Sequence, residues 1–269
     1  MKISILGCGW LGLPLACELV NKGDQVNGST RDPDKIGQIK EQGINPFLLE
    51  LSPEMICENA DEFFDSEILI LNIPPARRDD IVDFHPRQIQ SIIDAVNSCP
   101  VKNVIFTSST SVYPELNREV AEDETAEPRK NSGKALKIVE NMLLSEFGFN
   151  TTVLRLAGLV GYDRNPRNFL KKRRVIRKIN SPVNLVHRDD CIGVIMEVIN
   201  RGIWGEVFNV CCDNHPRRID FYKSECEKAG LEFDDPGEME TADYKLVSNK
   251  KLKDSLKYSF IYPDPLNME

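Results

Sequence analysis

The sequence of 269 residues is poor in the residues from which metal sites are built, and it has no long apolar run. It contains only three histidines, His85, His187 and His215, and no Cys-x-x-Cys pair, so we expect no bound metal. No stretch approaches the roughly 18 apolar residues that a membrane helix needs. A targeting signal is not recognisable either, because glycines and Glu18 interrupt the first apolar stretch. These absences predict a cytoplasmic protein without a membrane partner.

An excess of positive charge is also missing. The 34 lysines and arginines stand against 42 acidic residues, which gives a net charge of -8 and a pI near 5.2. This balance disfavours nucleic acid and anionic membranes as partners. One dense basic run lies between residues 171 and 178. We interpret it as a solvated helix face, with a phosphate-binding lid as the alternative.

The eight cysteines do not indicate disulfides. They are spread along the chain without paired spacing, and a cytoplasmic chain keeps its thiols reduced. Cys8, inside a glycine-rich turn, is therefore interpreted as a small packing residue rather than a reactive thiol.

The most informative pattern is a short apolar segment at the N-terminus that runs into Gly7, Gly9 and Gly12. It predicts a strand, a tight turn and the start of a helix. The spacing suits the phosphates of a dinucleotide: one glycine permits the turn, one lets the pyrophosphate approach the backbone, and one lets helix and strand pack closely. A helix beginning near Trp10 would direct its N–H groups at that pyrophosphate. We therefore predict cofactor contacts at the three glycines, Trp10 and Leu11.

The end of the second predicted strand, residues 25–30, bears on the choice between NAD and NADP. An acidic side chain there would bind the ribose 2′-hydroxyl, but the strand ends at Thr30 and Arg31. A hydroxyl and a guanidinium favour a 2′-phosphate, so we predict NADP, with NAD as the alternative. Asp32, an acidic residue that directly follows this strand end, favours NAD instead. We interpret it as the cap of a helix that begins at Pro33.

Further apolar segments predict the remaining strands of a parallel sheet, with helices between them. These segments are residues 46–51, 67–73, 101–107, 151–156, 183–186 and 206–210. The alternation predicts an α/β fold with a doubly wound, Rossmann-type sheet. Because strand carboxyl ends face the ligand in such sheets, we expect Asn72 and Pro74 to line the nicotinamide half of the groove.

The chain loses its regular alternation after residue 156. We predict that residues 1–156 form the dinucleotide-binding core. Residues 157–269 would complete the sheet at about 182–211 and form a small C-terminal substrate-binding lobe.

A cluster of hydroxyl residues follows the predicted strand 101–107. Such a cluster can bond neighbouring backbone in a turn, or it can serve a ligand at the end of the strand. We predict that Ser108 contacts the cofactor, that Ser109 is catalytic and that Thr110 binds substrate.

Several segments, taken in order, resemble one known superfamily. They are GCGWLG, the Pro-Pro pair after 67–73, SSTSVYP, VHRDD, FNVCCDNHPRR and VSNKKLKDSL. Together they resemble the extended short-chain dehydrogenases/reductases, which include NAD-dependent epimerases and dehydratases, and within them an atypical, YeeZ-like branch. The resemblance implies a Rossmann sheet of about seven strands, a C-terminal substrate lobe and a homodimer formed through two helices.

The resemblance also implies a catalytic group of a hydroxyl residue, a tyrosine and a lysine four residues further on. Ser109 occupies the place of the hydroxyl residue. When the glutamate that follows the family's lysine is set on Glu140, Ser132 falls at the tyrosine position and Leu136 at the lysine position. Neither side chain can exchange the expected proton.

An acid that takes the role of the absent tyrosine would have to be another titratable residue. The candidates are Tyr113, Tyr162 and His187, and for each a structural role is the favoured interpretation. Tyr162 and His187 are also predicted to bind substrate, together with Thr110.

Two functions remain open. The first is an NADP-dependent oxidoreductase or epimerase-like enzyme that acts on a carbonyl, a hydroxyl or a sugar-nucleotide-like small molecule. The second is a non-catalytic NADP-binding regulatory or scaffold protein, which accounts for the absent tyrosine and lysine without a replacement.

Overall fold

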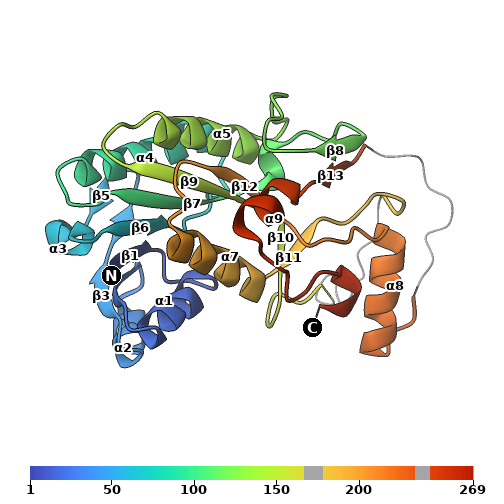
Figure 1. Ribbon diagram of the computed structural model, residues 1–269, viewed down its shortest axis with the longest axis horizontal. Helices are drawn as coiled ribbons and strands as arrows, with labels where there is room; N and C mark the ends of the chain where they lie inside the picture. Colours follow the sequence, from blue (N-terminus) through green and yellow to red (C-terminus); the bar gives the residue numbers. More distant parts are fainter. Residues whose placement is uncertain (167–177, 234–242, 269) are drawn as a thin grey trace. The chain divides into compact units, whose positions relative to one another are not determined.

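The computed structural model of the chain describes residues 1–166, 178–233 and 243–268. Its main sheet has seven strands in the order β12-β9-β7-β6-β1-β2-β3 (Figure 1). These are β1 (Lys2–Leu6), β2 (Gln25–Thr30), β3 (Asn45–Leu48), β6 (Ile68–Leu71), β7 (Asn103–Ser109), β9 (Asn150–Leu156) and β12 (Val207–Val210). The neighbours from β7 to β3 pair in parallel. The predicted Rossmann-type α/β fold is confirmed.

Helices connect the strands of this sheet. They are α1 (Gly12–Asn21), η1 (Pro33–Lys35), α2 (Ile36–Glu41), α3 (Ala60–Phe64), α4 (Ile81–Val96), η2 (Thr110–Val112), α5 (Asn131–Leu144) and α7 (Arg188–Arg201). Helices α4 and α5 pack against each other on one face of the sheet, opposite α1 and α2 (Figure 1). Because helices cover both faces, the central strand β6 is apolar throughout, and all four of its residues are buried.

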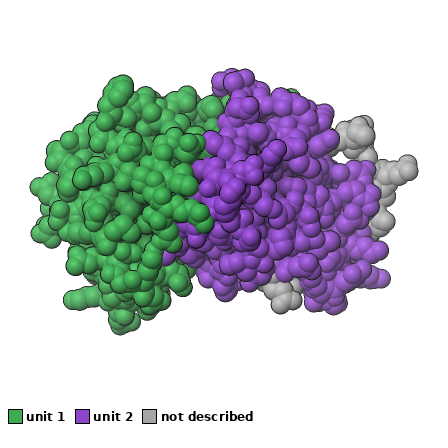
Figure 2. Space-filling view, in the orientation of Figure 1, with its two compact units in different colours: residues 1–112, 128–155, 198–207 green, residues 113–127, 156–197, 208–269 purple. Residues whose placement is uncertain are grey.

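The chain forms two compact units (Figure 2). The first comprises residues 1–112, 128–155 and 198–207, and the second residues 113–127, 156–197 and 208–269. The second unit holds two small parallel pairs, β10 (Gly158–Val160) with β11 (Leu185–His187) and β8 (Arg118–Val120) with β13 (Lys245–Val247). Its other elements are α8 (Arg218–Ala229), α9 (Lys250–Leu256) and η3 (Pro265–Asn267).

Several predicted strands have different bounds in the structure, and the pairing explains two of these differences. The predicted strand 46–51 leaves the sheet after Leu48, because the chain turns back as a hairpin of β4 (Glu50–Leu51) and β5 (Met55–Ile56). The predicted strand 183–186 is instead Leu185–His187, since the backbone N–H of Val183 bonds to Pro216. It was expected in the main sheet, but it pairs with β10 in a separate two-stranded sheet. In both cases the pairing partner, which the local sequence does not reveal, decides the bounds.

Most of the basic run lies outside the described residues. This holds for Lys171, Lys172, Arg173, Arg174 and Arg177. Lys178, its last member, pairs with the carboxylate of Glu115 and donates to the carbonyl of Asp243 at 3.0 Å.

A buried histidine in α4 makes the stability of the chain depend on pH. His85 is 0% exposed, its Nδ1 lies 3.1 Å from Gln88 Oε1, and its Nε2 has no partner among the described residues. Burial lowers the pKa of the imidazole. The neutral form is therefore the one that the fold accommodates.

We expect the free energy of unfolding to fall as the pH drops below about 6.5, because the unfolded histidine then binds a proton that the folded one does not. The slope contributed by His85 approaches about 1.4 kcal/mol per pH unit. Urea unfolding between pH 7.5 and 5 should show a smaller loss for His85→Gln than for the wild type. Burial also lowers the pKa of His215, so His215→Gln should reduce the loss as well, and Lys40→Gln, at an exposed lysine, is the matched control. Parallel curves for the wild type and His85→Gln would contradict the prediction.

Candidate functional site

The turn between β1 and α1 gives each of its glycines a different role. Gly7 has φ +104°, and a Cβ there would lie 2.5 Å from the carbonyl oxygen of Asn72. A Cβ at Gly12 would lie 2.1 Å from the carbonyl oxygen of Gly7. A Cβ at Gly9 would meet nothing within 4 Å. Gly7 and Gly12 are thus required by the fold, whereas Gly9 leaves bare backbone beside open space.

Helix α1 begins at this turn without a side-chain cap. Leu11 is its N-cap residue and makes no capping hydrogen bond, and the first turn holds no acidic residue. The helix starts at Gly12 rather than at Trp10, so both Trp10 and Leu11 belong to the turn. Exposed N–H groups and the positive end of the helix dipole are the features that bind a phosphate.

Asn72 ties the ends of two further strands to the glycine turn. Its Nδ2 donates to the carbonyl of Gly7 at 3.0 Å, and its Oδ1 accepts from the hydroxyl of Thr107 at 3.2 Å. The Asn72 side chain therefore fixes the backbone of the turn. Pro74 lies exposed in the loop after β6.

The end of β2 places Thr30 and Arg31 beside the same turn. Ser29 Oγ accepts from the N–H of Gly7 at 3.0 Å, and Thr30 Oγ1 accepts from the N–H of Asp32 at 3.1 Å. The Asp32 carboxylate accepts from the N–H of Asp34 and caps η1, which confirms the predicted helix cap. The guanidinium of Arg31 is exposed and makes no ion pair or hydrogen bond with any described residue.

Cys8 packs under this end of the sheet. A Cβ at Gly28 would lie 2.7 Å from its Sγ, so the thiol fills the space that the glycine leaves. Burial raises the pKa of Cys8 to about 12. The thiol is thus neutral near pH 7 and serves as a packing group, as the sequence predicts.

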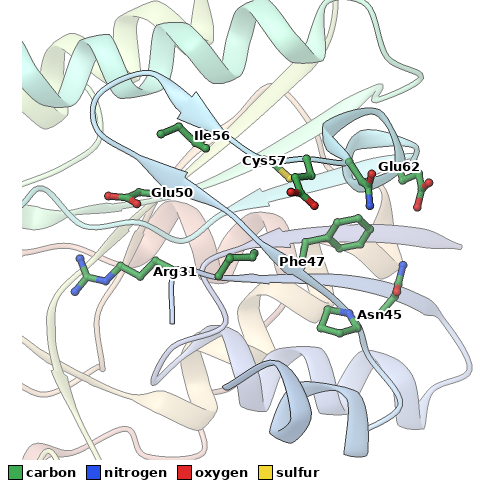
Figure 3. Close-up of a pocket in the computed structure, with 11 residues that line it drawn as sticks. Arg31, Asn45, Phe47, Glu50, Ile56, Cys57 and Glu62 are labelled. Carbon is green, nitrogen blue, oxygen red and sulfur yellow. The ribbon is translucent and has the colours of Figure 1, made fainter. Parts of the chain in front are cut away.

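A groove lies beside β3 (Figure 3). Its cavity volume is about 450 Å³. Arg31 and Glu50 stand at one end in the view, Asn45 and Glu62 at the other, and Phe47 between them. The groove therefore begins at one of the predicted cofactor residues and continues along the edge of the sheet.

The hydroxyl cluster at the end of β7 divides into inward and outward residues. Ser108 is buried, and its hydroxyl donates to Glu140 Oε1 at 2.6 Å. Ser109 is half-buried, and its Oγ accepts from the N–H of Ser111 at 3.1 Å. Thr110 begins η2 and is 7% exposed. Ser109 is therefore the most exposed of the three predicted site residues.

Glu140 forms a buried ion pair that the sequence analysis missed. Its carboxylate accepts from Arg155 Nη2 at 2.7 Å and from Arg155 Nε at 3.1 and 3.2 Å. Both side chains are almost completely buried. The sequence feature that could have indicated this ion pair is Arg155, an arginine inside the apolar strand β9. A buried arginine needs a carboxylate close by, and Glu140 is the one that the structure supplies.

Helix α5 carries the two positions at which the resemblance implies tyrosine and lysine. Ser132 is half-buried in its first turn, and Leu136 is 2% exposed in the core. The helix lies so close to η2 that a Cβ at Gly133 would come within 2.3 Å of the carbonyl oxygen of Ser111.

In the second unit, Tyr162 lies beside the start of α7. Its ring is 56% exposed, its φ is +56°, and its hydroxyl lies 3.0 and 3.1 Å from the carboxylate oxygens of Asp189. The guanidinium of Arg188 lies 3.8 Å from the ring centre. A left-handed conformation at a bulky residue is strained and is held here by these contacts.

The other two aromatic candidates are buried. His187 is 1% exposed and its ring centre lies 3.9 Å from that of Tyr262. Tyr113 is 3% exposed and donates to Asn209 Oδ1 at 2.8 Å. Both side chains have the structural surroundings that the sequence analysis favoured for them.

Asp190 is a second buried carboxylate that the sequence analysis did not single out. It accepts from the hydroxyl of Tyr258 at 3.0 Å and from the N–H groups of Ile261 and Tyr262 at 2.6 and 3.0 Å. These bonds fasten the C-terminal segment to α7. Asp190 belongs to the VHRDD segment, which the sequence analysis used only for the family resemblance.

Within residues 1–166, 178–233 and 243–268, no helix is long and apolar enough to cross a membrane. The same residues hold no group of three or more histidine, cysteine, aspartate or glutamate side chains arranged to bind a metal.

The parallel sheet and the glycine turn define a Rossmann-type α/β protein. Comparison with known families makes this more specific, because residues 76–211 match the NAD dependent epimerase/dehydratase family. The chain is also 33% identical to the protein YeeZ of Escherichia coli K12 over 270 residues, which is 99% of this chain and 98% of YeeZ. The chain belongs to the NAD dependent epimerase/dehydratase family, and the resemblance found in the sequence is confirmed.

Solved structures show the same fold. UDP-glucuronic acid 4-epimerase from Bacillus cereus in complex with NAD is 18% identical, with a TM-score of 0.79 over 100% of this chain and 97% of that chain. UDP-glucose 4-epimerase from Thermotoga maritima with UDP-glucose is 17% identical, with a TM-score of 0.79 over 97% and 94%.

Proposed function

We propose that this chain binds NADP and acts as an oxidoreductase or epimerase-like enzyme on a carbonyl, a hydroxyl or a sugar-nucleotide-like small molecule. The observation that carries the proposal is the open backbone at Gly9, beside the uncapped N-terminus of α1. The NAD in the Bacillus cereus epimerase and the UDP-glucose in the Thermotoga maritima epimerase support the cofactor and substrate classes.

The proposed cofactor site is built from the ends of β1, β2, β6 and β7. Gly9 and the first N–H groups of α1 would bind the pyrophosphate, and Thr30 and Arg31 the 2′-phosphate. The other proposed contacts are Gly7, Trp10, Leu11, Gly12, Asn72, Pro74 and Ser108. The nicotinamide supplies the hydride donor or acceptor when it is bound.

The substrate would be held by hydroxyl and aromatic side chains. Ser109 is proposed to bind the reacting oxygen, with Thr110 as a further contact. Tyr162 and His187, whose ring centres lie 5.6 Å apart, are the substrate contacts proposed within the second unit. Ser132 and Leu136 stand where the family's tyrosine and lysine are expected and supply no acid or base. Orientation would then account for most of the rate enhancement, and the usual 10²- to 10⁴-fold from general acid–base catalysis would be lost or supplied by another group.

We expect NADP and NADPH to stabilise the chain more than NAD and NADH at equal concentration. A ligand at 100 times its dissociation constant adds about 2.7 kcal/mol to the free energy of unfolding, which thermal unfolding detects. Arg31→Gln should weaken NADP binding about tenfold and leave NAD binding unchanged. Lys40→Gln, at an exposed lysine of α2, is the matched control. A larger stabilisation by NAD than by NADP would contradict the assigned role of Arg31.

The second candidate is a non-catalytic NADP-binding regulatory or scaffold protein. The serine and leucine at positions 132 and 136 favour it, because it needs no proton donor. NADPH oxidation measured with a panel of carbonyl compounds and sugar nucleotides separates the two. Turnover that is lost in Ser109→Ala supports the enzyme, whereas tight NADPH binding without any turnover supports the regulatory protein.

We also propose a cytoplasmic homodimer that buries the outer face of α4 and α5. Ile138, Leu144 and Phe147 lie at or beyond α5 as exposed apolar side chains, 38, 41 and 104% exposed. Large apolar side chains that stay exposed on and just beyond one helix are the feature that favours an interface there. Sedimentation equilibrium of the wild type and of Phe147→Ser tests it, since a monomeric wild type rules the dimer out.

A further inference from the structure

The groove beside β3 offers a binding site that the proposed chemistry does not use. β3 is the last strand in the order of the sheet. The groove is lined by residues 31, 45–48, 50, 56–59 and 62, and none of these belongs to the glycine turn. Only Arg31 is shared with the proposed cofactor site.

The ionic side chains of this groove are unpaired. The lining holds one arginine and three glutamates, and Arg31, Glu50, Glu58 and Glu62 make no ion pair or side-chain hydrogen bond with any described residue. A neighbouring carboxylate behaves differently, because Glu54 pairs with Arg87 at 2.9 Å. Charges that stay unpaired around a concave surface are available to a ligand.

The middle of the groove is apolar and open. Leu48 is 50% exposed and Ile56 is 65% exposed, although both are large aliphatic residues. Phe47 lies between the charged ends and packs edge-on against Phe63, with ring centres 5.3 Å apart (Figure 3). An exposed apolar strip with polar groups at both ends is typical of a ligand site.

We propose that this groove binds an elongated small molecule with an anionic group at one end and an ammonium group at the other. Figure 3 shows Arg31 at the end where the anion would bind and Glu62 at the opposite end, where the ammonium would bind. Leu48 and Ile56 would cover the apolar chain between them. A ligand with only one charge would leave either Arg31 or Glu62 without its complement.

The groove would also link its ligand to the choice of cofactor, a consequence that rests on the proposed role of Arg31. One guanidinium cannot serve the anion in the groove and the 2′-phosphate of NADP at full strength. NADP and the groove ligand therefore weaken each other by the same factor, whereas NAD leaves the groove ligand unaffected.

Titration calorimetry of the full chain with 6-aminohexyl phosphate tests the groove. Hexyl phosphate and hexylamine, which each lack one charge, are the comparison probes. We expect 6-aminohexyl phosphate to bind at least about tenfold more tightly than either. Arg31→Gln and Glu62→Gln should each remove that advantage, and Glu50→Gln should tighten binding because it removes the carboxylate near the anionic end. Lys40→Gln should change nothing.

Equal affinities for the three probes would overturn the proposed binding site. An unchanged affinity for 6-aminohexyl phosphate in both Arg31→Gln and Glu62→Gln would overturn it as well. Titration of NADP and NAD in the same samples keeps this result separate from the proposed function. Equal affinities of the wild type for the three probes, with intact NADP binding, refute the groove site alone. Probe binding that NADP does not weaken refutes the shared use of Arg31 but supports the groove as a binding site.

Discussion

Glu140→Leu is expected to lower the free energy of unfolding by about 3–5 kcal/mol, because it leaves the guanidinium of Arg155 buried without its carboxylate. The two groups lie 2.7 Å apart at Nη2 and Oε2, and both are almost completely buried. The hydroxyl of Ser108, 2.6 Å from Oε1, loses its acceptor as well. Urea unfolding at pH 7 measures the loss.

A double-mutant cycle separates the ion pair from simple packing. Arg155→Met alone should also be strongly destabilising, because it leaves the carboxylate of Glu140 buried without the guanidinium of Arg155. The double variant Glu140→Leu/Arg155→Met should cost less than the sum of the two, since buried ion pairs are often replaced by apolar residues at little cost. Additive losses in the cycle, or a loss below about 1 kcal/mol for Glu140→Leu, would contradict a buried pair.

This pair also marks a limit of the sequence analysis. An arginine within the apolar strand β9 was visible, and Glu140 had been used to align the family's helix. That the two side chains meet depends on how α5 packs against the sheet, and local periodicity carries no information on that packing. The strands themselves were predictable, because a parallel strand covered on both faces is a continuous apolar run, as in β6.

Pairings between distant segments explain the remaining misses. β8 pairs with β13, although more than a hundred residues separate them. Asp190 binds the backbone N–H groups of Ile261 and Tyr262, which follow it by 71 and 72 residues. Short polar strands and single carboxylates have no pattern of their own, so their partners can be assigned only after the chain has folded. The groove beside β3 was missed for the same reason, since the hairpin of β4 and β5 forms part of its lining.

The three glycines of the turn, in contrast, were recognisable by spacing alone, and two of them should fail in different ways when changed to alanine. In Gly12→Ala the new Cβ would lie 2.1 Å from the carbonyl oxygen of Gly7. The backbone has to move, which costs about 1–3 kcal/mol or more of stability. In Gly9→Ala the Cβ meets nothing within 4 Å and φ is not positive. Stability should therefore be retained or rise slightly, because alanine restricts the unfolded chain.

Gly9→Ala, the variant that should keep its stability, should be the one that directly loses NADP affinity. Gly9→Ala puts a methyl group where the pyrophosphate would approach the backbone, so NADP affinity should fall at least about tenfold, or 1.4 kcal/mol. Gly37→Ala is the matched control, because a Cβ at Gly37 also meets nothing within 4 Å and the residue lies in α2. Urea unfolding without cofactor and NADP titration by calorimetry measure the two effects. Wild-type NADP affinity in Gly9→Ala would contradict the phosphate site, whereas lost affinity at unchanged stability assigns Gly9 to the ligand and Gly12 to the fold.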